Sequence, residues 1–490
     1  MNLYLLSLLA YSILLMGLGL FVSRRVRSSS DFLVAGRSLS PARIFATFLA
    51  ANIGAGSTVG AAGLGYRFGL SAWWWVGSAA IGTFILSLTV GPRLWSIAKA
   101  HNLATLQDYL ELRFGKSVKA FIAVLFWIGA MALLAGQIIA IAWILQAVAG
   151  VPKWQGCLIG GMVAIVYCTA GGMVSTSFVN IFELAVTMSG LLLAVPFALH
   201  RLGGWSHLHA LVAQHSTAPV AAFSLSGAGP HQLLAWIAIL VPSFIVSPGL
   251  VQKVYGARNP SAVRLGVGLN SLGQAIFAFV PAILGLCAFA ALPHLANPEL
   301  ALPTAMKLLL PPWLGAWTLA SIFSAELSAT DAILFMLSTS LAVDLYKTFL
   351  NPQVEQRRLL AISRLTSVCA GLLGIALAVV LPSIIAAVSI FYGLIAVSLF
   401  VPVLAGLYSR RVLAPAALAS IACALATTLV VMRLTDDRGL GSFSPQALGI
   451  LASAVVMLVF RVFAPRRIQP GARANPAFAG GTADGEQSSP

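Results

Sequence analysis

Charged residues are scarce in this chain. Lys, Arg, Asp and Glu together make up 9% of its 490 residues, whereas soluble domains carry about 25%. Hydrophobic residues make up 59%, which is more than a soluble fold accommodates. The net charge of +16 does not indicate nucleic acid as a partner, because the basic residues are spread between apolar runs. The composition therefore predicts a protein of the lipid bilayer.

The chain also lacks the patterns of metal, disulfide and catalytic chemistry. Its five cysteines lie within or beside apolar segments and have no CxxC spacing, which indicates packing residues. No nucleophile–base set, metal-ligand spacing or phosphate loop stands out. We therefore expect neither an enzyme nor an organic cofactor.

What the chain has in abundance is long apolar runs, which predict an all-α polytopic membrane protein. The first run carries its arginines after the apolar stretch, which favours a retained first helix with the N-terminus outside over a cleaved signal. We expect about 13 transmembrane helices with boundaries good to about four residues, at 3–22, 44–66, 70–92, 119–149, 156–171, 180–200, 231–252, 264–292, 313–344, 363–382, 384–408, 412–432 and 444–463.

The distribution of basic residues predicts how these helices are oriented. With thirteen spans starting outside, 23 of the 29 Lys and Arg residues fall on the cytoplasmic side. This is the positive-inside pattern of a multi-pass protein in the cytoplasmic (inner) membrane, with the C-terminus in the cytoplasm. The six basic residues left outside are Arg67, Lys153, Arg201, Lys307, Arg433 and Arg438.

Two of the predicted spans contain residues that interrupt a helix. Five glycines crowd the span at 44–66, and each lowers helix stability by about 1 kcal/mol. The span at 231–252 holds Pro242, Pro248 and Gly249, which remove backbone hydrogen bonds. Freed backbone groups are tolerated in lipid where they line a cavity, although glycines also serve simply to pack helices tightly.

Each interrupted span opens a block of five, so the two blocks have opposite orientations. This is the pattern of an inverted-repeat transporter with its site near the membrane midplane. We expect a first helix at 1–23, five-helix repeats at 42–200 and 231–410, two helices at 411–464 and a disordered cytoplasmic tail at 465–490.

The span at 313–344 carries two acids near its middle. Glu326 and Asp331 are accompanied by the hydroxyl residues Ser324, Ser328 and Thr330. A carboxylate at that depth costs several kcal/mol unless it is paired, protonated or facing a wet cavity. The cluster predicts a cation or solute pathway; the alternative is a polar contact between neighbouring helices.

Five segments together resemble the sodium:solute symporter family over nearly the whole chain. They are DFLVAGRSLSP (31–41), AANIGAGSTVGAAGLGY (50–66), ATLQDYLELRFG (104–115), GGMVSTSFVNIFE (171–183) and the segment ending STSLAVDLYK (338–347). The resemblance implies a leucine-transporter-like fold, with one helix before the two repeats and two after them.

The resemblance also implies a sodium site. The family binds sodium with backbone carbonyls of the broken first core helix and with a carbonyl and hydroxyls of the eighth. Those positions fall here on Ala50 and Ile53, and on Ala325 and Ser328. Where relatives often place a second hydroxyl this chain has Ala329, which shares one helix face with Ala325 and Ser328.

Other positions depart from the family pattern or match it only in part. Asn180 stands where many members have Asp, and Glu326 takes a place commonly held by a small residue. Asp331 matches an aspartate of many members. Sodium is the expected coupling ion, and a protonatable Glu326 or Asp331 is the alternative carrier.

The remaining candidates concern the substrate and the ion exit. Ser57, Thr330 and Trp73–Trp75 are candidate substrate or coupling positions, although tryptophans also mark the outer membrane interface. Glu183 either lines the ion exit or caps its helix.

We therefore expect a secondary active transporter that imports a small organic solute with sodium. The alternatives are a proton-coupled or uncoupled transporter on the same fold, and a transporter-like membrane sensor. The expected partners are the solute, sodium and the bilayer, without nucleic acid.

Overall fold

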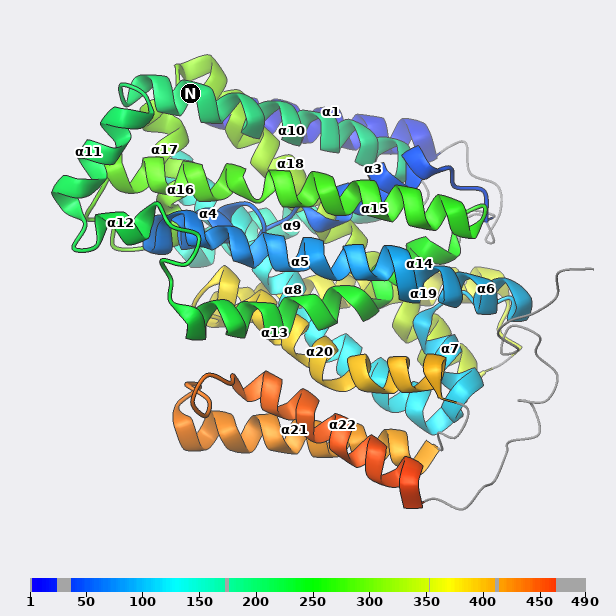
Figure 1. Cartoon of the computed structure of the whole chain (residues 1–490). Helices are drawn as coiled ribbons and strands as arrows, with labels where there is room; N and C mark the ends of the chain where they lie inside the picture. The colour runs from blue at the N-terminus through cyan, green and yellow to red at the C-terminus, as the bar shows by residue number, and fades with distance from the viewer. Residues whose placement is uncertain (1, 24–36, 172–175, 352, 410–413, 464–490) are drawn as a thin grey trace, which may run out of the picture.

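The chain folds into a bundle of helices (Figure 1). The computed structural model describes residues 2–23, 37–171, 176–351, 353–409 and 414–463. Within these residues the structure contains isolated bridges but no strand. The main helices are α1 (Leu3–Ser23), α3 (Pro41–Asn52), α4 (Val59–Phe68), α5 (Trp73–Ile85), η3 (Leu86–Val90), α6 (Gly91–His101), α7 (Leu106–Phe114), α8 (Lys116–Ala149), α9 (Lys153–Gly171), α10 (Thr176–Arg201), α11 (Trp205–His215), α12 (Pro219–Ala222), α13 (Pro230–Val246), α14 (Pro248–Tyr255), α15 (Pro260–Phe277), α16 (Phe279–Ala291), η4 (Pro298–Leu300), α17 (Ala301–Leu309), α18 (Pro312–Thr339), η5 (Ser340–Leu350), α19 (Gln356–Val380), α20 (Ile384–Tyr408), α21 (Ala414–Thr435) and α22 (Pro445–Phe463).

Every predicted span overlaps one helix or several consecutive helices, which confirms the all-α class. Ten helices in the described ranges are long and apolar enough to cross a membrane. The chain is therefore a multi-pass membrane protein. The number thirteen is not confirmed by this criterion and stays a prediction.

Three segments are longer or more ordered than their sequence suggested. The span predicted at 70–92 continues through η3 and α6 to His101. The stretch 201–230, which lies between two predicted spans, contains the helices α11 and α12. The helix α18 continues into the π-helical η5, which ends at Leu350.

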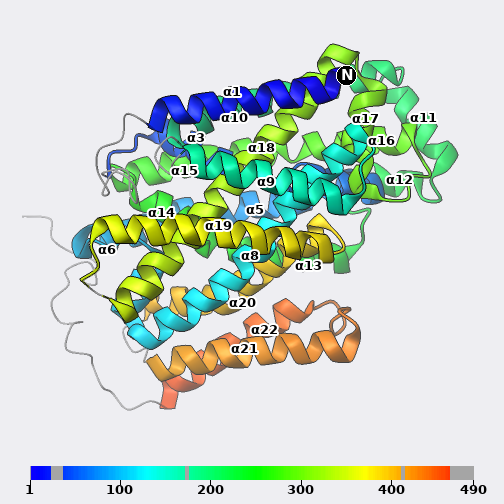
Figure 2. The same cartoon turned by 180° about the vertical axis from the view of Figure 1, so that it is seen from behind.

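The continuous helix α18 lies in the interior of the bundle. It packs on α1, α8, α10 and α19, and its middle residues are buried on all sides. Two views from opposite sides show α1 along one flank and the pair α21–α22 along the other (Figures 1 and 2). The mid-helix acids and hydroxyls therefore face protein.

A short bridge ties together the ends of the two interrupted spans. The N–H of Leu39, just before α3, donates to Gly256 O at 3.0 Å, and the N–H of Arg258 donates to Leu39 O at 3.1 Å. Beside this bridge the Arg37 guanidinium donates to Ala98 O at 3.0 Å. The start of α3 and the segment after α14 are thus held side by side.

The repeat boundaries 42–200 and 231–410 stay predictions. The tail predicted at 465–490 lies outside the described residues.

Candidate functional site: the two helix breaks and α18

The span at 44–66 is broken, as its glycines predicted. Helix α3 ends at Asn52, Ile53 is extended with φ −101° and ψ 104°, and α4 begins at Val59. A Cβ on Gly54 would lie 2.9 Å from both Ala329 Cβ and Gln137 Oε1. Glycine is therefore required here because the backbone approaches α18 and α8 so closely.

Side chains from the neighbouring helices stabilise the open backbone of this break. The N–H of Ala55 donates to Gln137 Oε1 of α8 at 2.8 Å, and the Trp75 indole of α5 donates to Gly56 O at 2.9 Å. The Ser57 hydroxyl accepts from Gly54 N and donates to Asn52 O, at 3.0 and 2.9 Å. These hydrogen bonds hold the break in one conformation. The Ser57 hydroxyl is already hydrogen-bonded to the backbone of the break itself.

The second interrupted span is broken at Ser247. Its φ of −56° and ψ of 122° leave the helical region, and Pro248 opens α14. Pro242, by contrast, lies inside α13, and the helix continues past it to Val246. A Cβ on Gly249 would lie 2.5 Å from the sulfur of Met336, so this break also adjoins α18.

The residues expected to bind sodium lie at the first break and on α18, and all are buried. The N–H of Ile53 donates to Leu49 O, while that of Gly54 donates to the Ser57 hydroxyl instead of to Ala50 O. In the described part of the chain, neither the Ala50 nor the Ile53 carbonyl accepts a hydrogen bond. Two backbone carbonyl oxygens at the end of α3 are therefore available as ligands.

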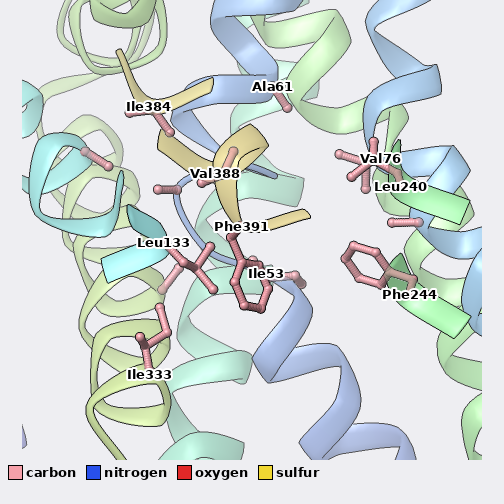
Figure 3. Close-up of a cluster of buried hydrophobic side chains, with 14 of the residues drawn as sticks. Ile53, Ala61, Val76, Leu133, Leu240, Phe244, Ile333, Ile384, Val388 and Phe391 are labelled. Carbon is pink, nitrogen blue, oxygen red and sulfur yellow. The ribbon is translucent and has the colours of Figure 1, made fainter. Parts of the chain in front are cut away.

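Apolar side chains also lie near this break. Figure 3 shows Ile53 among Leu133 of α8, Ile333 of α18 and Phe391 of α20. Unpaired carbonyls in such surroundings are costly unless a ligand meets them.

On α18, Ala329 faces the break through its contact with the Gly54 position. The Ser328 side chain interacts with the Glu183 carboxyl of α10. The departure at position 329 therefore places a methyl group where a hydroxyl would have faced Gly54.

Glu326 is bound to the second half of the broken helix, at the start of α4. The Thr58 hydroxyl, at the N-terminus of α4, donates to Glu326 Oε1 at 2.7 Å, and Thr330 donates to Glu326 O at 2.6 Å. Glu326 is fully buried, and its Oε2 has no hydrogen-bond partner among the described residues. The helix dipole of α4 favours a carboxylate at this end.

Glu183 and Asp331 belong to a second cluster. The Tyr167 hydroxyl of α9 donates to Glu183 Oε1 at 3.1 Å, and the Asp331 carboxyl interacts with the Cys168 thiol. The structure thus separates the acids predicted on α18, since Glu326 faces α4 and Asp331 faces α9 and α10. The side chain of Asn180 lies outside the described residues.

Sequence reasoning did not single out Gln137, Thr58 or the partner of Trp75. The signal for Gln137 was available, because a lone amide in the apolar run LLAGQIIA of α8 needs a polar partner when buried. Trp75 is 3% exposed and bonds the break, so it is not an interface tryptophan.

Two helices broken at mid-length, both set against one continuous helix, are the arrangement of a secondary transporter. The model of the sodium:solute symporter family matches residues 32–424, and the chain belongs to this family. It is accordingly a sodium-coupled solute transporter, as the sequence predicted.

The similarity to named relatives covers most of the chain. It is 24% identical over 489 residues to a sodium/glucose cotransporter of Vibrio parahaemolyticus, covering 92% of this chain and 88% of that protein. It is 27% identical to a sodium/pantothenate symporter of Escherichia coli K12, covering 93% and 95% of the two chains.

Solved structures share the fold. A Na⁺-coupled sialic acid symporter superposes with a TM-score of 0.79 at 16% identity, covering 96% of this chain and 99% of that one. A transporter of the nucleobase-cation-symport-1 family gives a TM-score of 0.59 at 14% identity, with 89% and 94% covered. These likenesses confirm the leucine-transporter-like fold.

Proposed function

We propose that the chain imports a small organic solute together with sodium across the cytoplasmic membrane, with its N-terminus outside and its C-terminus in the cytoplasm. The 23 basic residues that this topology leaves inside, out of 29, support the orientation. An inward sodium gradient then drives uptake of the solute.

Sodium binds between the first break and α18 in this proposal. The carbonyls of Ala50 and Ile53, the carbonyl of Ala325 and the hydroxyl of Ser328 supply hard oxygen ligands. The observation that carries the assignment is the pair of unpaired carbonyls at the end of α3, buried against α18. The methyl of Ala329 leaves this ion with one oxygen fewer.

The second cluster supports an additional role for Glu183 and Asp331. Both carboxyls are buried, both lie beside the Ser328 turn of α18, and Glu183 Oε2 has no hydrogen-bond partner in the described ranges. Proton coupling through this cluster is the second candidate function. It predicts uptake driven by a pH gradient without sodium, which disappears in Asp331→Asn.

The names of the relatives supply the first set of solutes to test. Their names include glucose, pantothenate and proline. Ser57, Thr330 and Asn180 stay candidate positions for substrate or coupling. Ser57 acts through the shape of the break in this proposal, because its hydroxyl is already bonded to the backbone.

The test is uptake into proteoliposomes with imposed gradients. Purified protein is reconstituted, and radiolabelled D-glucose, pantothenate and L-proline are offered under an inward sodium gradient, an inward proton gradient or neither. Sodium-driven accumulation of one solute supports the proposal. Accumulation driven by the proton gradient alone would replace it with the second candidate.

A further inference from the structure

One acid outside the predicted spans is buried, whereas the acids of another loop that the proposed topology places outside are exposed. Glu299 of η4 is 7% exposed, whereas Asp436 and Asp437 of the loop after α21 are exposed. Among the described residues it forms no ion pair. A buried carboxyl must find hydrogen bonds instead.

Glu299 finds them at the start of α20 and on α8. Its Oε1 accepts from the N–H groups of Ile384 and Ile385 at 2.7 and 3.2 Å. Its Oε2 accepts from the Trp143 indole at 2.9 Å and from Ile384 N at 3.0 Å. The carboxyl therefore caps the N-terminus of α20 and joins it to α8.

The outer half of the broken helix packs against the same place. A Cβ on Gly63 would lie 3.1 Å from Pro298 O, and a Cβ on Gly60 would lie 2.9 Å from Ile385 Cδ1. We call this contact of α4 with η4 and the start of α20 the outer seam.

The seam reaches the first break through α20. One turn beyond Ile384, Val388 Cγ2 lies 3.4 Å from where a Cβ on Gly56 would be. Figure 3 shows Ile384 and Val388 beside the broken helix. The cap thus fixes the helix that covers the break.

We propose that Glu299 is a positioning residue for transport: its carboxyl latches α20 and α8 to the outer loop and holds the outer seam closed. The inference rests on the proposed function, because the seam matters only if the break lines a solute path that opens to the outside. Loss of the carboxylate releases the start of α20 and lets the seam open more often.

The test measures access from the outside, past the outer seam, to Val388 at the first break. Val388→Cys is introduced into the full chain with its five native cysteines replaced by alanine, and a membrane-impermeant maleimide is added from the outside of intact cells. Glu299→Gln keeps the size of the side chain but turns an amide N–H toward the donors. We expect about ten-fold faster alkylation, because charge-assisted bonds to two helices are lost.

Matched variants separate the latch from simple capping. Asp437→Asn, which neutralises an exposed acid of another outer loop, should alkylate at the parental rate. Trp143→Phe removes one donor only and should give a smaller increase, about three-fold. A purely structural cap would lower the amount of folded protein in Glu299→Gln and leave the alkylation rate and the half-saturating sodium concentration of the remainder unchanged.

An alkylation rate in Glu299→Gln equal to the parental rate overturns the proposal. If that variant does not reach the membrane, a parental rate in Trp143→Phe overturns it instead. Alkylation needs no solute, so a failed uptake screen removes the proposed function without deciding the latch. Sodium-driven uptake with unchanged alkylation removes the latch alone.

Discussion

The change Ala329→Ser adds one hydroxyl to the face of α18 that lies against the first break. Ala329 is 5% exposed, so the new oxygen cannot be satisfied by bulk water. If Ala50, Ile53, Ala325 and Ser328 hold sodium, the hydroxyl becomes a further ligand. A gain the size of one hydrogen bond, about 1 kcal/mol, corresponds to about five-fold tighter sodium binding.

The five-fold gain in sodium affinity is an upper limit, because the hydroxyl of a serine on a helix can also donate a hydrogen bond to the carbonyl four residues earlier. Thr330 does so with Glu326 O at 2.6 Å. A serine at 329 has the same option with Ala325 O, and sodium must compete with that bond.

The assay is the sodium dependence of solute uptake in proteoliposomes, with the half-saturating sodium concentration as the readout. Ala320→Ser is the matched control, since Ala320 is a buried alanine of α18 nine residues earlier and about 180° around the helix. We expect a shift to lower sodium in Ala329→Ser and none in the control.

Ser328→Ala should shift the half-saturating concentration upward by at least as much. It is the less clean variant, because it also removes the contact with Glu183. An unchanged value in both Ala329→Ser and Ser328→Ala would refute the sodium site.

Three further outcomes follow from the breaks, the acids and the charges. Gly54→Leu should abolish uptake while the protein still reaches the membrane, because its side chain would collide with Ala329 and Gln137; Gly17→Leu, where nothing lies within 4 Å, should transport normally. Asp331→Asn should leave sodium-driven uptake insensitive to pH if that carboxyl exchanges a proton, and a parental pH profile would exclude it as the carrier. Cysteine labelling should find positions near Lys116, Arg358 and Gln487 inside and those near His215 and Arg438 outside; an outside tail would contradict the thirteen-span topology.

The helix breaks could be predicted from sequence because they depend on local backbone preferences. Gly54 and Gly56 weaken a helix wherever they stand, and Pro248 cannot continue one. Pro242 shows the limit of this reasoning. It too removes a backbone donor, yet α13 continues through it because a helix tolerates the loss of one bond when its neighbours hold the turn in place.

The partners of the buried polar groups could not be predicted, because they depend on how distant segments pack. Gln137 and Ala55 are 82 positions apart, Thr58 and Glu326 are 268 apart, and Glu299 and Ile384 are 85 apart. Glu326 and Asp331 seemed one group, since they share a short stretch of α18. Five residues correspond to about 500° of helix rotation, so their side chains point to different neighbours.

The bridge between Leu39 and Gly256–Arg258 has a mechanical consequence for an alternating transporter. It fastens the entry of α3 to the exit of α14, the two half-helices that in the proposed topology reach the cytoplasm. A tilt of either half pulls on the other through two backbone hydrogen bonds. If the inner side opens by a tilt of these half-helices, we expect the two to move together.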